Sequence, residues 1–312
     1  MSDPVISAVV PIVERHSDLK EVFRQFAEAF KELGEPFEFI FVLDGDLAEA
    51  RKELEELQPG GVPVKVVKLG RAFGEAAALR VGFERARGDY IFTVPPSFQV
   101  EPAAVKKLWE ELRGGADLAV ARRYPRVDSI VNRMQSALFH FLVRRATGTK
   151  FHDISCGLRA LRRSVLQELN LYGGLHRFIP VLAAAQGFKV TEVPVPQRPE
   201  NLSPRFFGLP RYTRYLLDIL TLFFVTKFTM MPLRFFGGIA AVLIVLGAGI
   251  TGYLGLYRLL GYGPIANRPL LLLGVLLIAV GMQILSLGLI GELVIFLHAR
   301  ELKPYRVEEV IE

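Results

Sequence analysis

Hydrophobic and polar positions follow two alternating patterns along the first two thirds of the chain. Short apolar runs bounded by glycine, proline or charged residues predict buried strands. Between them, apolar residues recur every three to four positions, as on a helix that packs on a sheet. The predicted strands cover residues 6–13, 37–43, 64–69, 90–94, 117–121 and 189–195, and the predicted helices cover about 18–33, 74–87, 103–112 and 179–186. This order predicts a doubly wound, mostly parallel α/β sheet whose strand ends gather at one ligand-binding edge.

The last third of the chain is much more apolar. Residues 235–257 and 269–291 contain no charged side chain. Each run is long enough to cross a hydrocarbon core of about 30 Å at about 1.5 Å per residue, which predicts two transmembrane helices. The preceding segment, 212–228, predicts a helix at the membrane interface. The expected domains are a cytoplasmic α/β domain (1–210), an interfacial helix (211–232), a transmembrane pair (233–298) and a cytoplasmic tail (299–312).

The positive charges around the two apolar runs predict their orientation. Cations are concentrated on the outer flanks of the pair, whereas the short connection carries only Arg258 and Arg268. Cytoplasmic flanks carry an excess of Lys and Arg, so the large domain and both termini are expected on the cytoplasmic face of the inner membrane. The N-terminus has no basic region followed by a long apolar stretch, so it does not predict a signal peptide.

Composition narrows the class of partner. The 312 residues carry a formal charge of +6 with a pI near 9.4, which suits a nucleic acid, an anionic membrane surface or phosphorylated substrates. The single cysteine, Cys156, excludes an internal disulfide framework and a thiolate metal site built by this chain alone. A reducing compartment is the simpler expectation.

The run LGRAFGEAAALRVGFERARGDYIFTV, residues 69–94, resembles the corresponding stretch of inverting family 2 glycosyltransferases. It is most similar to the branch that includes dolichol-phosphate mannose synthases and moves sugars onto polyprenyl phosphates. The resemblance extends from Pro11 through the C-terminal apolar runs. It implies a GT-A, Rossmann-like fold, a nucleotide-sugar donor and a polyprenyl-phosphate acceptor at the cytoplasmic face of the membrane.

The metal motif of that family is altered in this chain. Members of the family carry Asp-x-Asp-x-Gln after this strand, and its side chains hold a divalent metal against the donor diphosphate. Here Pro95 and Ser97 replace the two carboxylates and only Gln99 matches. Two alternatives follow. Mg²⁺ or Mn²⁺ is held weakly by Gln99, Glu101 and the diphosphate, or cations neutralise the diphosphate instead. The candidate cations are Arg71, Arg122, Arg123, Arg205 and Arg211.

The resemblance also implies a donor side at the strand ends. Asp44, which follows the second strand, is the candidate base or ribose contact, with an Asp44-Gly45 turn as the structural alternative. Arg122 and Arg123 follow a strand, where guanidinium groups meet phosphate, although a charge run also suits a solvated surface. The predicted donor-binding set is Pro11, Glu14, Asp44, Arg71, Gln99, Arg122 and Arg123.

The segment FHDISCGLRALRRSV, residues 151–165, carries the acceptor-side resemblance. Its Asp153-x-x-x-Gly157-x-Arg159 matches the family signature, which makes Asp153 and Arg159 the candidate catalytic residues. Asp153 is a general base or an orienting group, and the alternative is a carboxylate that caps the following turn. A Pro-, Arg- and aromatic-rich loop follows near residues 197–215. The candidate acceptor phosphate ligands are Arg126, Arg198, Arg205 and Arg211.

Loss of both metal-motif carboxylates leaves a second function open, a non-catalytic relative that binds a lipid phosphate or a partner enzyme. A processive polysaccharide synthase is excluded, because the only tryptophan, Trp109, is not in a Gln-x-x-Arg-Trp motif. Arginines interleaved with aromatic residues also occur in nucleic-acid-binding proteins, but the neighbouring segments favour no nucleic acid. Glycines in both apolar runs favour close helix packing, within the chain or in a homo-oligomer.

Overall fold

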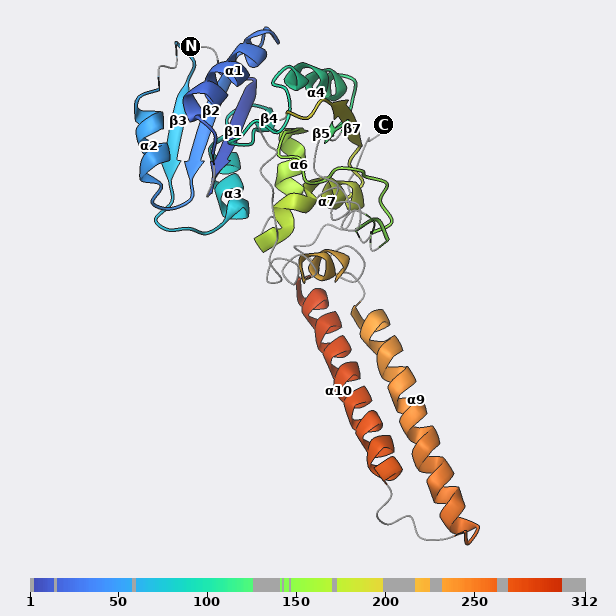
Figure 1. Cartoon of the computed structure of the whole chain (residues 1–312). Coiled ribbons are helices and arrows are strands. Elements are labelled where there is room, and N and C mark those ends of the chain that lie inside the picture. Colours follow the sequence, from blue (N-terminus) through green and yellow to red (C-terminus); the bar gives the residue numbers. More distant parts are fainter. Residues whose placement is uncertain are drawn as a thin grey trace. The chain divides into compact units, whose positions relative to one another are not determined.

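The computed structural model describes residues 3–13, 16–57, 60–125, 141, 143–145, 147–169, 173–198, 217–224, 232–262 and 269–298. The chain forms two compact units, Met1–Leu222 and Phe223–Glu312 (Figure 1). The first contains a sheet with helices, and the second contains two long helices.

The first unit is organised by a seven-stranded sheet within the described residues. Its order is β3-β2-β1-β4-β6-β5-β7, and β6 alone runs antiparallel to its neighbours β4 and β5. This confirms the predicted doubly wound, mostly parallel fold. The strands are β1 (Ile6–Ile12), β2 (Phe37–Leu43), β3 (Val64–Lys68), β4 (Tyr90–Thr93), β5 (Leu118–Arg123), β6 (Arg159–Arg162) and β7 (Val190–Val195).

Helices separate most of these strands, and the predicted ones are confirmed with ends shifted by a few residues. The N-terminus of α1 is capped by Asp18, whose carboxylate accepts hydrogen bonds from the backbone of Lys20 and Glu21. The helices of this part are α1 (Leu19–Lys31), α2 (Ala48–Glu55), α3 (Glu75–Arg85), α4 (Ala104–Arg113), α6 (Arg163–Glu168), the 3₁₀ helix η1 (Gly173–Phe178) and α7 (Ile179–Ala185). Strand β6 and helices α2, α6 and η1 were not among the predicted elements.

An aromatic core holds α1 and α4 against one face of the sheet. Phe30 of α1 meets Phe92 of β4 edge to face, with ring centroids 5.1 Å apart, and Phe23 meets Phe39 of β2 in the same way at 5.0 Å. Each such buried side chain contributes about 1.5–3 kcal/mol through loss of apolar surface from water. Helix α3 covers the opposite face, where Gly82 allows close approach to Val9 of β1.

The parallel register brings the ends of β1, β2 and β4 to one edge of the sheet. Strand β1 pairs in parallel with β2 from Ile6–Phe37 to Ile12–Leu43, and with β4 from Ile6–Tyr90 onward. Residues that follow β2 and β4 therefore lie at the same edge, and α3 begins there after Gly74. This edge is the place where the sequence predicts ligand binding.

The second unit contains α9 (Pro232–Leu259) and α10 (Pro269–His298), which lie side by side (Figure 1). Both are long and apolar enough to cross a membrane, and most of their large apolar side chains are exposed, unlike those of helices in a soluble core. Each is longer than its predicted span. Of the predicted interfacial helix, residues 217–224 are helical, and its remaining residues up to 231 lie outside the described part.

Candidate active site

The donor side of the predicted site is shaped by Asp44, which directly follows β2. Its buried carboxylate accepts hydrogen bonds from the backbone N–H groups of Phe73 at 2.7 Å and Gly74 at 2.8 Å. Gly45 has a φ of 97°, and a Cβ there would lie 2.9 Å from the backbone nitrogen of Ala72. Asp44-Gly45 therefore joins the end of β2 to the loop that precedes α3, and a nucleoside contact by Asp44 stays a prediction.

Two exposed side chains of that same loop form a stacked pair. The guanidinium carbon of Arg71 lies 4.9 Å from the ring centroid of Phe73, and both side chains are exposed. Because the Phe73 backbone is bound by Asp44, the stack lies at the carboxyl-end edge of the sheet. A cation beside an exposed aromatic ring suits a nucleotide, which offers both a base and phosphates.

The segment after β4 is packed directly on residues 151–158, which carry the acceptor-side resemblance and are here called the acceptor loop. The Gln99 Oε1 atom accepts a hydrogen bond from Gly157 N at 2.9 Å, and Thr93 Oγ1 donates to Gly157 O at 2.7 Å. A Cβ at Gly157 would lie 3.0 Å from the Cβ of Pro95. Glycine at this position of the family signature therefore suits the close packing against Pro95 of the altered metal motif.

The residues at this position do not fit a metal site built from carboxylates. Pro95 offers no side-chain ligand, the Asp44 carboxylate is bound to two backbone amides, and Glu101 forms an ion pair with Arg198 at 3.1 Å. Among the described residues, no group of three or more His, Cys, Asp or Glu side chains is arranged to hold a metal ion. Ser97 and Gln99 offer neutral oxygens here, and the Gln99 oxygen already accepts the Gly157 amide.

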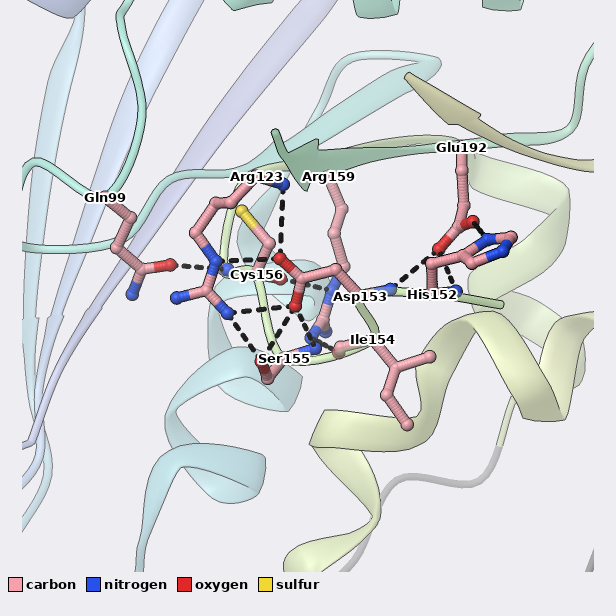
Figure 2. Close-up of polar contacts among 10 residues, drawn as sticks. Gln99, Arg123, His152, Asp153, Ile154, Ser155, Cys156, Arg159 and Glu192 are labelled. Atoms are coloured by element: carbon pink, nitrogen blue, oxygen red, sulfur yellow. Dashed lines mark hydrogen bonds and ion pairs between the residues drawn. The ribbon is translucent and has the colours of Figure 1, made fainter. Parts of the chain in front are cut away.

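The acceptor loop carries Asp153 in a saturated environment (Figure 2). Arg123, the last residue of β5, donates to this carboxylate from Nε at 2.7 Å, from Nη2 at 2.9 Å and from its backbone N at 3.2 Å. Ser155 donates from Oγ at 2.9 Å and from its backbone N at 3.3 Å. A carboxylate offers about four lone-pair sites, so these five contacts occupy it. The geometry suits an orienting group better than a group that takes up a proton.

Arg159 of β6 is buried beneath the same loop. It donates to the carbonyl oxygens of Cys156 at 3.0 Å, His176 at 2.7 Å and Ile154 at 3.2 Å. Burial lowers the pKa of Arg159, although arginine stays protonated in proteins. Burial also raises the pKa of the Cys156 thiol, which disfavours a nucleophilic thiolate. These contacts give Arg159 a loop-holding function, and its catalytic role stays a prediction.

A histidine–carboxylate contact links two elements that carry no predicted site residue. Nε2 of His176 in η1 lies 3.2 Å from a carboxylate oxygen of Glu75, the first residue of α3, and Nδ1 lies 3.3 Å from Gly173 O. Burial acts to raise the pKa of Glu75, but His176, Arg159 and Arg177 outweigh it and lower that pKa overall. The pair joins the start of α3 to η1, and only the folded chain brings these distant residues together.

Some of the remaining predicted site residues lie in the described part of the structure, and the others lie outside it. Pro11 lies within β1, opposite Val42, and Arg122 stacks on Tyr124 at 5.3 Å. Arg198 stacks on Phe98 at 4.5 Å and donates from Nη1 to Gln25 of α1 at 3.0 Å, so it links the segment after β7 to the segment after β4. The predicted residues that lie outside the described part are Glu14, Arg126, Arg205 and Arg211.

Comparison with known proteins agrees with this architecture. The family model described as glycosyl transferase family 2 matches residues 7–169. A dodecaprenyl-phosphate galacturonate synthase from Rhizobium johnstonii is 30% identical, over 96% of this chain and 91% of that protein. An undecaprenyl-phosphate 4-deoxy-4-formamido-L-arabinose transferase from Pseudomonas aeruginosa is 31% identical, over 92% of this chain and 84% of that protein.

Solved structures with the same fold come from more distant proteins. Glucosyl-3-phosphoglycerate synthase from Mycobacterium tuberculosis, in complex with UDP, has a TM-score of 0.54 and 18% identity, and the match covers 72% of this chain and 80% of that one. The same enzyme in complex with Mn²⁺, UDP-glucose and glycerol 3-phosphate has a TM-score of 0.53 and 16% identity, with the same coverage. At this identity the likeness concerns the fold alone.

Proposed function

Since this chain belongs to glycosyl transferase family 2, we propose that it transfers a sugar from a nucleotide-sugar to the phosphate of a polyprenyl lipid. The observation that carries the proposal is the extent of the similarity. The two relatives named for transfer to a polyprenyl phosphate match 96% and 92% of the chain, so the likeness includes the long apolar helices as well as the sheet. A polyprenyl-phosphate acceptor is a membrane lipid, and two helices able to cross a membrane would hold the enzyme where that lipid lies.

The reaction is a displacement at the anomeric carbon of the sugar. An oxygen of the acceptor phosphate forms the new bond, the bond to the donor diphosphate breaks, and the configuration inverts. The phosphate nucleophile is already anionic, so little proton removal is required. This agrees with an Asp153 carboxylate occupied by Arg123 and Ser155, which orients the acceptor side.

The leaving nucleoside diphosphate concentrates negative charge at the edge of the sheet. The Mycobacterium tuberculosis synthase has been solved in complex with Mn²⁺ and UDP-glucose, but Pro95 and Ser97 replace the two metal-motif carboxylates after β4 of this chain. We assign the charge neutralisation to arginine, because preorganised cations stabilise developing charge as a metal does. The candidates are Arg71, Arg122 and Arg123, with Arg205 and Arg211 as predicted contributors outside the described residues.

The membrane arrangement is part of the proposal. Residues 1–210 form the catalytic domain on the cytoplasmic side, 211–232 lie at the interface, and 233–298 cross the inner membrane twice. The cations on the outer flanks of the two helices support this orientation and attract anionic head groups at about 1 kcal/mol each. A polyprenyl phosphate presents its phosphate at that surface.

A lipid-transfer assay tests the proposal. The full chain in nanodiscs is incubated with undecaprenyl phosphate and a panel of radiolabelled UDP- and GDP-sugars, with EDTA, Mg²⁺ or Mn²⁺. We expect label to enter the lipid phase with at least one donor, and EDTA to reduce the rate by less than about twofold. Complete loss of transfer in EDTA would contradict charge neutralisation by arginine, but it would not contradict sugar transfer as the function.

The same assay separates catalysis from binding. Donor or lipid binding without transfer across the panel would favour the non-catalytic alternative, which the missing carboxylates support. Arg211→Ala and Asp153→Asn are the site variants. We expect each to lower the rate by roughly tenfold or more, since one charge-assisted contact contributes about 1.5–3 kcal/mol. Undiminished transfer in both variants would show that the assigned site is wrong.

A further inference from the structure

Glu192, a residue of β7 that no sequence motif indicated, binds the backbone of the acceptor loop. Its side chain is only 13% exposed. The Oε1 atom accepts hydrogen bonds from the backbone N of His152 at 2.7 Å and of Asp153 at 2.9 Å, and Oε2 lies 2.9 Å from His152 Nδ1 (Figure 2). One carboxylate therefore fixes two consecutive residues of the loop.

These contacts continue through Asp153 to the sheet edge. The carboxylate of Asp153 binds Arg123 through Nε, Nη2 and the backbone N, so the position of Asp153 sets the plane of the guanidinium group. Glu192 and Arg123 lie on neighbouring strands, since β7 pairs in parallel with β5 from Leu118–Val190 to Arg123–Val195. The loop is thus held between two strands, by a carboxylate from β7 and a guanidinium from β5.

We propose that Glu192 is a positioning residue for sugar transfer, which holds Asp153 and, through it, Arg123 in the geometry that phosphate groups require. The inference rests on the proposed function, because it assigns Arg123 to a phosphate-facing role. The chemistry suits the task. One oxygen of this side chain accepts two backbone amides at once, so its reach decides whether both contacts form. Catalysis depends on such second-layer contacts, since small misplacements of reacting groups are costly.

A purely structural role makes different predictions. If Glu192 only joins β7 to the loop, its removal lowers the amount of folded protein but leaves the turnover of the folded fraction intact. Asp117 provides the matched control, because its Oδ2 atom accepts a hydrogen bond from the backbone N of Lys189, just before β7 begins. Asp117→Ala removes a carboxylate–amide contact at the start of the same strand and leaves the Glu192 contacts with His152 and Asp153 in place.

The experiment compares Glu192→Ala, Glu192→Gln, Glu192→Asp and Asp117→Ala as full chains in nanodiscs. Readouts are kcat, the KM of each substrate, and hydrogen exchange of the backbone amides in a peptide covering residues 150–156. For Glu192→Ala we expect kcat to fall on the order of 10–100-fold with a change of less than about threefold in donor KM. Glu192→Gln keeps an amide-accepting oxygen at the same reach and stays within about threefold of the wild type.

Glu192→Asp keeps the charge but is one methylene shorter, so it is expected to turn over more slowly than Glu192→Gln. Faster exchange at residues 150–156 should accompany Glu192→Ala and not Asp117→Ala. An active wild type whose Glu192→Ala variant keeps kcat within about twofold would overturn the inference. So would an Asp variant that equals or exceeds the Gln variant, a comparison that stands even where Glu192→Ala does not fold.

Failure of the proposed function is a separate outcome. It is recognised by a wild type that transfers no sugar across the donor panel. The hydrogen-exchange arm then decides the positioning part of the inference without any activity. Equal protection of residues 150–156 in wild type and Glu192→Ala would show that Glu192 does not hold the loop.

Discussion

At the scale of single residues, the carboxylates at the sheet edge are used by the protein itself. Asp44 accepts two backbone amides and Asp153 accepts five contacts from Arg123 and Ser155. Both carboxylates already accept hydrogen bonds from other groups of the chain. We therefore expect them to act on substrates through the groups they hold, the Arg71–Phe73 loop for Asp44 and Arg123 for Asp153.

Replacement of Asp44 should affect donor binding. Asp44→Ala removes the acceptors of the Phe73 and Gly74 amides, and an unpaired buried donor costs about 1–3 kcal/mol. We expect nucleotide affinity, measured by calorimetric titration with UDP and GDP, to fall about tenfold as the loop loses its shape. Asp46→Ala is the control, since Asp46 is exposed and pairs only on the surface with Lys68. Equal affinities in the two variants would contradict the loop-shaping role.

The buried Glu38 carboxylate should make the stability of the fold depend on pH. This buried carboxylate near the start of β2 accepts hydrogen bonds from Ser7 Oγ at 2.9 Å and Arg87 N at 2.8 Å, and pairs with Lys65 at 2.9 Å. Burial acts to raise the pKa of Glu38, but Lys65, Arg87 and Ser7 lower it overall from its ordinary value of 4.5. A lowered folded-state pKa stabilises the fold above pH 4.5, and that contribution is lost as pH falls through the folded pKa.

We therefore expect Glu38→Gln to destabilise the first unit at pH 7 by on the order of 1–3 kcal/mol. The difference in Tm between wild type and variant should shrink as the pH falls below 4.5. Thermal unfolding of the full chain in detergent at pH 7 and at acidic pH measures it. A gap that stays constant with pH would show that the ionised form of Glu38 contributes nothing.

The sequence located candidate residues but not their partners. Asp44, Gln99 and Asp153 were identified from the resemblance to family 2 glycosyltransferases, and Asp44 also follows a predicted strand, where ligands bind in parallel sheets. Their hydrogen bonds join residues 29, 58 and 30 positions apart in the chain. Only the folded chain defines such pairs, which is why Glu192 and the Glu75–His176 pair were missed.

At the scale of elements, glycines decide how α9 and α10 pack. A Cβ at Gly247 would lie 2.6 Å from the backbone oxygen of Gly274, whereas nothing lies within 4 Å of a Cβ at Gly249. The predicted close packing within the chain is thus assigned to particular positions, and a homo-oligomer through the remaining glycines stays a prediction. Glu292 adds a polar contact, since its carboxylate accepts from Leu233 N near the start of α9.

Two alanine variants of α9 test this packing. Both gain helix propensity of about 1 kcal/mol, but only Gly247→Ala forces the Gly274 backbone away. We expect Gly247→Ala to lower the Tm of the full chain in detergent by several degrees, because overpacking costs about 1–3 kcal/mol. Gly249→Ala should leave the Tm unchanged or raise it slightly. If both variants behave alike, the close contact of the two helices does not stabilise the chain.

Elements with a strong hydrophobic pattern were predicted from the sequence. Strand β6 was missed because its own residues carry no such pattern. Strand β6 reads Arg-Ala-Leu-Arg, too short and too charged for a strand pattern. Its arginines are satisfied by tertiary contacts instead. Arg159 binds three carbonyl oxygens, and Arg162 donates to Ala116 O and Leu112 O. Tertiary pairing with β4 and β5 overrides local propensity here.

At the scale of the whole molecule, two units of different chemistry form one chain. The first has a sheet with a buried aromatic core, and the second exposes apolar side chains along two long helices. The sequence predicted two long apolar helices after the sheet, because transmembrane segments need long uncharged runs. The flanking positive charge predicts on which side of the membrane each part lies.

Cysteine labelling of intact cells measures it. The only native cysteine, Cys156, is fully buried, so added cysteines report cleanly. Tyr262→Cys lies just beyond α9 on an exposed residue, and Glu28→Cys lies on the exposed surface of α1. We expect a membrane-impermeant maleimide to label Tyr262→Cys in intact cells and Glu28→Cys only after lysis. The reverse pattern would place the catalytic domain outside.

The anchors of the acceptor loop also set an order of events during synthesis. Arg123 is translated before the loop, and Glu192 emerges 39 residues after Asp153. The loop therefore cannot reach its final arrangement on the ribosome until β7 has left the exit tunnel. Residues 196–231 separate β7 from α9, so we expect the loop to be completed at about the time the first apolar helix is synthesised.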